Sequence, residues 1–481
     1  MITATSTPGS PSPYPTLGLP QIVVFNLLIF VWWLEVGLRV PALGAIRFEF
    51  LLAAIAAAMA IMRLQSAKRA PLQPRRGKVE DNSDITRCIV ILLVVLTLSL
   101  PLAINFNVAW NAFFNRAVKL ALIGVLISQF VVSPYTLRIH LFTLLLAFMK
   151  VGQEAFLGKI TGNMVWENQG VPRLHGTAGT MFGDPNSLSG KTVSTVPWIW
   201  YLYPTIQRKW IKLLVAVQLV FAINIVIFTA SRTGYMTFIA ASILIVMFTN
   251  QKRARLIFLL MVAAIVTVTL LPQEYKGRFM SSFTGQEAEG ASSITRKALL
   301  ADSFNAFLEN PLGIGMDCFP IYQAERDRNA QYTHNLYTQL LSETGIQGFL
   351  CFIALVVVVL RKLARTRRAL MNVVERLEKH PRPGPADSDS RFDTELRDVH
   401  LLLATANALL VFVLVRLALG MFGHDFLEIY WWAAAGMAMA LHNMRIVAEQ
   451  RCDELTAVAQ ETGTTSPAPR PLFHRPRYGQ R

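Results

Sequence analysis

The sequence has few charged residues for its length. Charged residues make up 16% of the 481 positions, whereas 53% are hydrophobic. A soluble protein must cover its surface with polar groups, and a chain this apolar has too few of them. The composition therefore argues against a soluble globular protein and predicts a protein embedded in a membrane.

Cysteine is scarce too, and several catalytic motifs are missing. The four cysteines form no CxxC pair, and neither HExxH nor a Walker-type Gly-rich loop occurs. Zinc-binding and nucleotide-hydrolysing sites commonly carry such motifs. We therefore expect no metal and no cofactor, and the sequence disfavours an ATP-driven pump.

Acidic residues are the rarer charged type. The 30 Asp and Glu against 46 Lys and Arg give a formal net charge of +16. In a soluble protein this excess would suggest nucleic-acid binding. Here the basic residues lie mostly between apolar runs, and no basic patch is interleaved with aromatic residues. We expect no nucleic-acid partner and interpret the basic residues as topology signals and contacts with membrane lipids.

Twelve apolar runs are long enough to cross a membrane as helices. Such a helix needs about 17–25 mainly apolar residues, because hydrocarbon offers its backbone no other hydrogen-bond partners. The sequence predicts an all-α polytopic protein with a disordered tail at 1–18, a transmembrane domain at 19–449 and a disordered basic tail at 450–481. The predicted spans are 19–37, 43–62, 88–104, 109–132, 136–156, 188–206, 211–228, 234–250, 254–272, 335–360, 399–418 and 426–445.

Lys and Arg gather in alternate connectors, which predicts the orientation of the chain. Basic connectors stay in the cytoplasm. We therefore expect a bacterial inner-membrane protein with both termini in the cytoplasm. The basic connectors are 63–87, 207–212, 251–255 and 361–398, together with the C-terminal tail. The opposite set is predicted to be periplasmic, chiefly 157–187, 229–233, 273–334 and 419–425.

Several cations fall in the outer halves of the predicted spans. Charges at this depth usually face a bundle interior or a watery cavity, although a long side chain can also snorkel to the headgroups. As a set they suggest a cationic cavity that opens to the periplasm and suits a phosphate-bearing substrate. These cations are Arg47, Arg116, Lys119, Lys150 and Lys191.

Arginines also stand out in the predicted periplasmic segments. RLHGTAGTMFGDPN contains Arg173 and, in a turn that opens the next helix, Asn186. The short turn TASRTG contains Arg232, whose planar fork of donors suits two phosphate oxygens. The long loop contains Arg278 and, in the first turn of an amphipathic helix, Arg296. Each has a structural alternative. The segment with Arg173 and Asn186 could be an ordinary turn, Arg232 could snorkel to the headgroups, and Arg278 and Arg296 could be solvated surface charges.

His334 lies in YTHN, at the outer mouth of the tenth predicted span. Imidazole can transfer protons near neutral pH, so His334 is the candidate general base, with a structural role as the alternative. Glu343 does not suit an orienting role, because nine residues along a helix place it on the opposite face. Asn335, directly after His334, is a candidate substrate ligand.

These motifs together resemble the O-antigen ligase and polymerase superfamily. The resemblance rests on the order and spacing of SRTG, an arginine-bearing loop that ends in NPLGIGMDCF, and THNLYTQLLSETGIQGFL. RLHGTAGTMFGDPN is similar to the Arg-x-x-Gly…Pro-Asn element that precedes these motifs in the family. The resemblance covers residues 173–350, and the first five spans match only in general layout.

The resemblance implies a metal-independent glycosyltransferase of the GT-C type. The ligases of this family move glycan from undecaprenyl diphosphate to the lipid A–core oligosaccharide in the periplasm. It implies that His334 deprotonates the acceptor hydroxyl, and that Arg232 binds the diphosphate together with Arg278 or Arg296. Without a metal, arginines must neutralise the leaving group. The further candidate substrate ligands are Arg173, Asn186, Asn335, Lys191 and Arg116.

Within the superfamily we favour a ligase, because the chain has one moderate outer loop and no large periplasmic domain. An O-antigen or exopolysaccharide polymerase is the first alternative. A transporter or flippase of lipid-linked glycans is the second, and it predicts functional charge on both sides and repeat symmetry. The unusual residues of this chain lie on one side, which favours an enzyme.

Overall fold

The computed structural model describes residues 14–69, 82–168, 170–249, 257, 273–284, 292–379, 386–423 and 426–461. Within these ranges the chain is almost entirely helical, with one two-stranded sheet. Seven of the described helices are long and apolar enough to cross a membrane. The protein is thus an all-α, multi-pass membrane protein, as predicted. The seven are Phe48–Ser66, Ser83–Leu102, Phe106–Phe130, Pro134–Thr161, Lys209–Phe228, Leu336–Lys379 and Phe392–Leu419.

The first half of the chain forms mostly single spans and short connecting helices. Its helices are α1 (Leu19–Trp33), α2 (Val36–Arg39), α3 (Pro41–Ala45), α4 (Phe48–Arg69), α5 (Ser83–Ser99), α6 (Phe106–Ala112), α7 (Lys119–Phe130), α8 (Pro134–Thr161), α9 (Pro185–Val193), α10 (Val196–Leu202) and α11 (Lys209–Phe228). Three short non-α turns join some of them: η1 (Leu100–Leu102), η2 (Phe113–Val118) and η3 (Tyr203–Thr205). The antiparallel strands β1 (Val165–Asn168) and β2 (Val171–Leu174) follow α8.

The second half contains the longest helices. They are α12 (Arg232–Phe248), α14 (Gln273–Thr284), α15 (Ser292–Glu309), α16 (Phe319–Ala324), α17 (Leu336–Lys379), α18 (Ala386–Leu419) and α19 (Ile429–Glu461). The amphipathic helix predicted in the long loop is α15. The predicted span 254–272, apart from residue 257, lies outside the described residues, as do residues 1–13 and 462–481 of the two tails.

The span predicted at 188–206 is broken in two. Helix α9 ends at Val193 and α10 begins at Val196, with Pro197 in its first turn. Proline has no N–H, and its ring collides with the carbonyl four residues earlier, so the regular helical hydrogen bonding is interrupted at this point. The hydrophobic pattern predicted the apolar stretch but missed the break.

The predicted connector 361–398 is helical over most of its length. Helix α17 continues to Lys379 and α18 begins at Ala386, while α19 extends to Glu461 into the predicted C-terminal tail. The apolar side chains of Leu363, Leu370 and Val374 lie buried on one side of the α17 extension. Because α17 packs against both α18 and α19, this apolar face sustains the helices beyond the spans.

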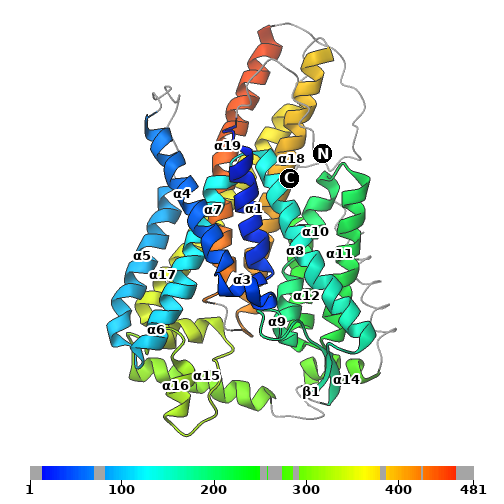
Figure 1. Ribbon diagram of the computed structural model, residues 1–481. Coiled ribbons are helices and arrows are strands. Elements are labelled where there is room, and N and C mark those ends of the chain that lie inside the picture. The colour runs from blue at the N-terminus through cyan, green and yellow to red at the C-terminus, as the bar shows by residue number, and fades with distance from the viewer. Residues whose placement is uncertain are drawn as a thin grey trace.

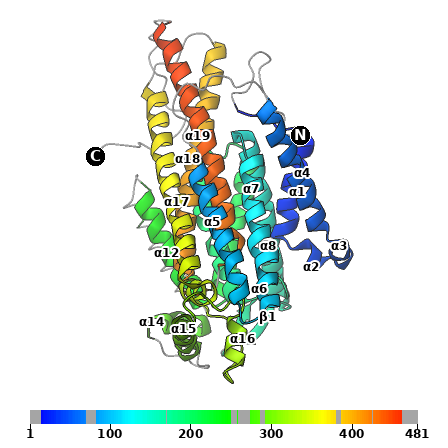
Figure 2. The same ribbon diagram turned by 90° about the vertical axis from the view of Figure 1, so that its left-hand side faces the viewer.

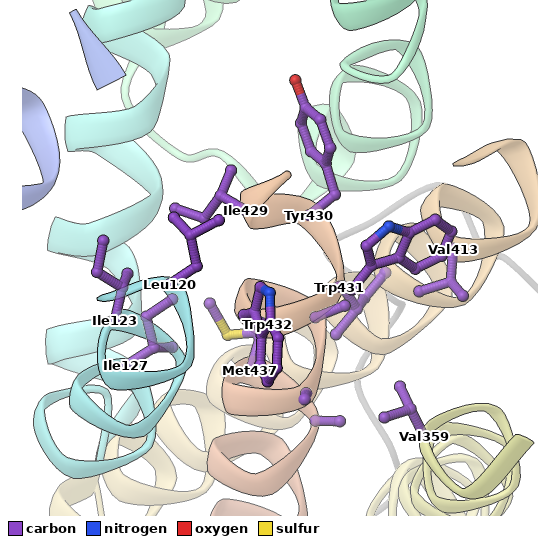
Figure 3. Packing of buried hydrophobic residues seen from close by; sticks show 14 of the residues in the cluster. Leu120, Ile123, Ile127, Val359, Val413, Ile429, Tyr430, Trp431, Trp432 and Met437 are labelled. Atoms are coloured by element: carbon purple, nitrogen blue, oxygen red, sulfur yellow. The ribbon is translucent and has the colours of Figure 1, made fainter. Parts of the chain in front are cut away.

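The centre of the bundle is formed by α19 with α7, α17 and α18 (Figure 1). Gly124 of α7 and Gly436 of α19 let the two backbones touch, because a Cβ at either position would overlap the facing main chain. Figure 3 shows Leu120 and Ile123 of α7 near Ile429 and Trp432 of α19. This contact fixes the position of α19, the helix that follows the predicted periplasmic loop 419–425.

One end of the bundle collects the shorter elements. Helices α15 and α16, together with β1 and α14, lie at the bottom of Figures 1 and 2. The extensions of α17, α18 and α19 project from the opposite end. We call the end with α15 and α16 the site end, because the residues predicted to carry the chemistry gather there.

Candidate functional site

A buried arginine organises one side of the site end. Arg173 lies in β2, and only 3% of its surface is exposed. Its Nε donates to the carbonyl oxygen of Thr229 at 2.9 Å, and its Nη2 donates to Oδ1 of Asn186 at 2.9 Å. The Ser231 hydroxyl donates to the same Asn186 oxygen, also at 2.9 Å. Two predicted site residues thus meet at the turn that contains a third, Arg232.

The TASRTG turn (residues 229–234) is shaped by its own sequence. Helix α11 ends at Phe228, and Ser231 caps α12 by accepting a hydrogen bond from the Gly234 N–H at 3.1 Å. Ala230 has a left-handed backbone with φ of 47°. A Cβ on Gly234 would overlap the hydroxyl of Ser189 in α9, so glycine permits this close packing. The half-buried Arg232 is therefore the first residue of α12, where helix N–H groups also favour anions.

Helix α14 brings a second arginine to the same turn. The Nε of Arg278 donates to the carbonyl oxygen of Ala230 at 2.8 Å. The Tyr275 hydroxyl donates to the carbonyl oxygen of Pro172, in β2, at 2.8 Å. Arg173 and Arg278 therefore bind the adjacent carbonyls of Thr229 and Ala230, and they hold the turn from two sides.

The electrostatics of Arg173 show that a third arginine lies nearby. Burial lowers the pKa of Arg173 to about 10, and the charges of Arg278 and Arg296 act in the same direction. The carboxylate of Asp184 acts in the opposite direction. Like charges gathered in a poorly solvated place repel one another, and a bound anion would relieve that repulsion. Several positive charges therefore lie close to the TASRTG turn.

His334 lies immediately before α17 in a left-handed backbone conformation, with φ of 49°. Non-glycine residues rarely adopt this conformation, and where they do they are often at functional sites. The Oδ1 of Asn335 accepts hydrogen bonds from the N–H groups of Tyr337 (2.9 Å) and Thr338 (3.1 Å). The Nδ2 of Asn335 donates to the carbonyl of Met421 at 3.2 Å. Asn335 thus ends the coil that presents half-buried His334.

The segment NPLGIG runs beside a break in α17. Ile314 donates its N–H to the Ser342 carbonyl at 2.8 Å, and Ile346 donates to the Pro311 carbonyl at 3.0 Å. Gly345 has φ of 69°, and a Cβ there would overlap the main chain of Leu312. Glu343 is 1% exposed, and the Nε2 of Gln339 donates to its carboxylate at 3.2 Å. NPLGIG and the break in α17 around Gly345 are therefore paired through their backbones.

Comparison with known proteins agrees with this arrangement. Residues 217–353 match the family model described as O-antigen ligase. This part of the chain is similar to the O-antigen ligase family. The predicted resemblance is confirmed for this part of the chain, which includes Arg232, Arg278, Arg296 and His334 and leaves Arg173 outside. No curated protein matches the chain.

Two predicted substrate ligands, Lys191 and Arg116, lie outside the matched residues 217–353 and contact other protein groups. Lys191 is 7% exposed, donates to the carbonyl of Met181, and lies 5.7 Å from the centre of the Phe182 ring. The Nε of Arg116 donates to the carbonyl of Leu427 at 3.2 Å. A guanidinium nitrogen of Arg116 also lies 3.8 Å from Oδ1 of Asp317. The structure thus joins both cations to loops around the site.

Sequence reasoning missed Arg416, which lies in α18, outside the matched residues 217–353. Arg416 is 2% exposed, and its guanidinium lies 3.7 Å from the centre of the Tyr430 ring. Its Nη1 donates to the hydroxyl of Ser194, at the break between α9 and α10, at 3.4 Å. The sequence does indicate this residue, because Arg416 is the one charged residue in the apolar run 401–419. A charge in such a run needs partners from other helices.

The part of the chain that the structure describes contains no group of three or more His, Cys, Asp or Glu residues arranged to hold a metal ion.

Proposed function

We propose that this protein is an O-antigen ligase, which transfers glycan from undecaprenyl diphosphate to the lipid A–core oligosaccharide. The observation that carries the proposal is the contact of Arg173 and Arg278 with the TASRTG turn, which contains Arg232, inside and beside the residues that match the O-antigen ligase family. The charge of Arg296 also acts on Arg173. A leaving diphosphate needs positive charge where the glycosidic bond breaks. This cluster provides it.

The proposed reaction is a single displacement at the anomeric carbon of the donor. His334 takes the proton of the acceptor hydroxyl, the acceptor oxygen bonds to the anomeric carbon, and the bond to the diphosphate breaks. Arg232 and either Arg278 or Arg296 receive the diphosphate. Protonated His334 and the released undecaprenyl diphosphate balance the charges. No step calls for a metal or another cofactor.

The buried arginine has a different part in this proposal. Arg173 is 3% exposed and bonded to protein oxygens, so it contributes charge and holds the turn without touching the diphosphate. Asn186 acts through the same hydrogen bonds. Asn335, Lys191 and Arg116 hold the surrounding loops in place, because each contacts main-chain carbonyls of neighbouring segments.

We place the site end in the periplasm of the inner membrane and both termini in the cytoplasm. The basic residues Arg208, Lys209 and Lys212 lie where α11 begins, and α11 ends at the TASRTG turn of the site end. The run RKLARTRR lies on the α17 extension, also away from the site end. Cytoplasmic connectors are the ones enriched in Lys and Arg, which supports this orientation.

The deciding experiment uses purified protein, undecaprenyl-diphosphate-linked glycan and lipid A–core, with EDTA and without ATP. We expect glycosylated lipid A–core, detected by its mass and its gel mobility. An absolute requirement for added Mg²⁺ or Mn²⁺ would contradict the arginine-only mechanism. Extension of glycan on the undecaprenyl carrier, with lipid A–core unchanged, would instead support a polymerase of the same superfamily.

A further inference from the structure

The exposed face of α6 and η2 carries a regular pattern that the proposed function leaves unused. The run FNVAWNAFFN repeats an aromatic residue followed by asparagine at four-residue intervals. Phe106, Trp110 and Phe114 are 52%, 47% and 46% exposed. The asparagines that follow them, Asn107, Asn111 and Asn115, are exposed as well. We call these six residues the α6 ladder.

The rings of the α6 ladder lie nearly parallel. The ring centres of Phe106 and Trp110 are 6.2 Å apart with an angle of 12° between planes, and those of Trp110 and Phe114 are 6.1 Å apart with 13°. Four residues of α-helix advance about 40° beyond one full turn, so a regular helix would fan the rings apart. The wider π turn of η2, which contains Phe114, rotates less per residue and counteracts this drift.

The asparagines form a polar row beside the rings. The Nδ2 of Asn115 donates to Oδ1 of Asn111 at 3.0 Å, and the ammonium group of Lys119 donates to Oδ1 of Asn115. An amide has two N–H donors and an oxygen with two lone pairs, so both asparagines keep capacity for further hydrogen bonds. The face therefore offers flat apolar surfaces and hydrogen-bonding groups side by side.

The depth of the ladder argues against lipid tails as its only neighbours. The helix Phe106–Phe130 has 25 residues, about 37 Å in length, and exceeds a hydrocarbon core of about 30 Å by only a few residues. The ladder covers about 14 Å from the end at Phe106. Phe106 and Asn107 thus lie at headgroup depth and Asn111 lies near the edge of the hydrocarbon core, where sugar hydroxyls can reach the amides.

Sugars have the matching chemistry. One face of a pyranose ring presents C–H groups that stack on an aromatic ring, and its rim presents hydroxyls that bond to amides. A four-residue repeat of ring and amide can therefore bind successive sugars of an oligosaccharide. We propose that the α6 ladder binds the sugar chain of the acceptor glycolipid, an inference that rests on the proposed function.

The position of the ladder favours the acceptor over the donor. Two of the arginines assigned to the donor diphosphate, Arg232 and Arg278, lie in α12 and α14, whereas α6 lies on the other side of the site end (Figure 1). A chain of contacts leads from the ladder toward the base. A guanidinium nitrogen of Arg116, next to Asn115, lies 3.8 Å from Oδ1 of Asp317, and Asp317 acts electrostatically on Tyr332, two residues before His334. An acceptor on α6 would therefore extend toward His334 from the side opposite the donor.

Leucine substitutions separate sugar binding from contact with lipid tails. Trp110→Leu and Asn111→Leu keep or increase the apolar character of the face and remove the flat ring or the amide. We expect each to raise the KM for lipid A–core roughly three- to tenfold, the usual effect of one lost contact. The KM for the undecaprenyl-linked donor should stay unchanged. Trp210→Leu, on a tryptophan 49% exposed at the start of α11, is the matched control.

A binding readout makes the test independent of turnover. A photoreactive amino acid in place of Phe114 should crosslink to added lipid A–core in nanodiscs and lose that crosslink when excess unlabelled lipid A–core competes. Crosslinking to phospholipid alone, or unchanged acceptor KM in both leucine variants of an active protein, would overturn the α6 inference. Wild-type protein that transfers no glycan to any acceptor would instead overturn the proposed function, and the α6 inference with it.

Discussion

Arg173 and Asn186 are joined by a hydrogen bond of 2.9 Å from Nη2 to Oδ1, and both residues lie outside the matched residues 217–353. The Oδ1 of Asn186 also accepts from Ser231, so one amide oxygen connects β2, the start of α9 and the TASRTG turn. The position of Arg232 therefore depends on residues that need not touch substrate.

Replacing Asn186 with leucine removes the shared acceptor. Asn186→Leu leaves buried donors of Arg173 and Ser231 without their partner, which costs about 1–3 kcal/mol for each buried group. We expect a lower unfolding temperature in detergent and a reduced transfer rate. Asn163→Leu, at an exposed position near the same hairpin, is the control. A wild-type rate and unfolding temperature in Asn186→Leu would show that the turn keeps its position without this oxygen.

The geometry of Arg232 can be tested without removing its charge. Arg232→Lys keeps the positive charge but loses the two-pronged donor geometry, so we expect transfer to be substantially impaired. Arg208→Lys, on an exposed arginine at the far end of α11, should have normal activity. Initial rates at saturating acceptor provide the measurement. Normal activity in Arg232→Lys would reduce Arg232 to a residue that snorkels to lipid headgroups.

Gly345 tests the pairing between NPLGIG and the break in α17. Gly345→Ala forces a side chain into a left-handed backbone against the main chain of Leu312. We expect low abundance in the membrane or a lower unfolding temperature. Gly277→Ala is the matched control, because a Cβ there meets nothing within 4 Å. Equal stability of the two variants would show that the backbone around Gly345 can adopt another conformation without loss of stability.

The orientation can be measured with single cysteines in a background that lacks the four native ones. We expect Asp327→Cys, in the exposed segment after α16, to react with a membrane-impermeant thiol reagent in cells with a permeabilised outer membrane. Asn372→Cys, on the exposed face of the α17 extension, should be shielded until the inner membrane is opened. The reverse pattern would invert the proposed topology and every assignment to the periplasm.

Sequence patterns predicted the spans well where a helix is regular and apolar. The predicted span 211–228 matches α11, Lys209–Phe228, and 136–156 lies within α8, Pro134–Thr161. They failed where a local proline or packing between distant helices decides the structure. Hydrophobicity alone does not show that Pro197 breaks the span 188–206, nor that residues 361–379 stay helical because α18 and α19 cover them.

The same limit applies to the candidate site. The order of the motifs predicted the arginines around the TASRTG turn. Which of them can reach a substrate depends on their burial, which the sequence does not show. The sequence predicts Arg173 as a substrate ligand, and the structure adds that it is 3% exposed and bonded to Thr229 and Asn186. Arg416 escaped notice because its partners Ser194 and Tyr430 come from distant parts of the chain.

His334 tests the catalytic proposal. Because its φ is 49°, substitution by asparagine, which tolerates a left-handed backbone, changes the chemistry with less strain than alanine does. We expect His334→Asn and His334→Ala each to lose roughly 10²-fold or more in transfer rate, the usual scale for removing a general base. Membrane abundance should stay normal in the asparagine variant. A small loss of rate in both variants would exclude His334 as the base.

The same variants distinguish a ligase from a polymerase inside cells. In a strain that lacks its own ligase, the wild-type protein should restore long glycan on lipid A–core, and His334→Asn should not. Undecaprenyl-linked glycan of full length should then accumulate, because chain extension continues while transfer is blocked. A polymerase defect would instead leave single repeat units on lipid A–core, since ligation continues without extension. Single-repeat lipopolysaccharide in the variant would therefore contradict the ligase assignment and keep His334 catalytic, whereas full-length lipopolysaccharide would contradict both.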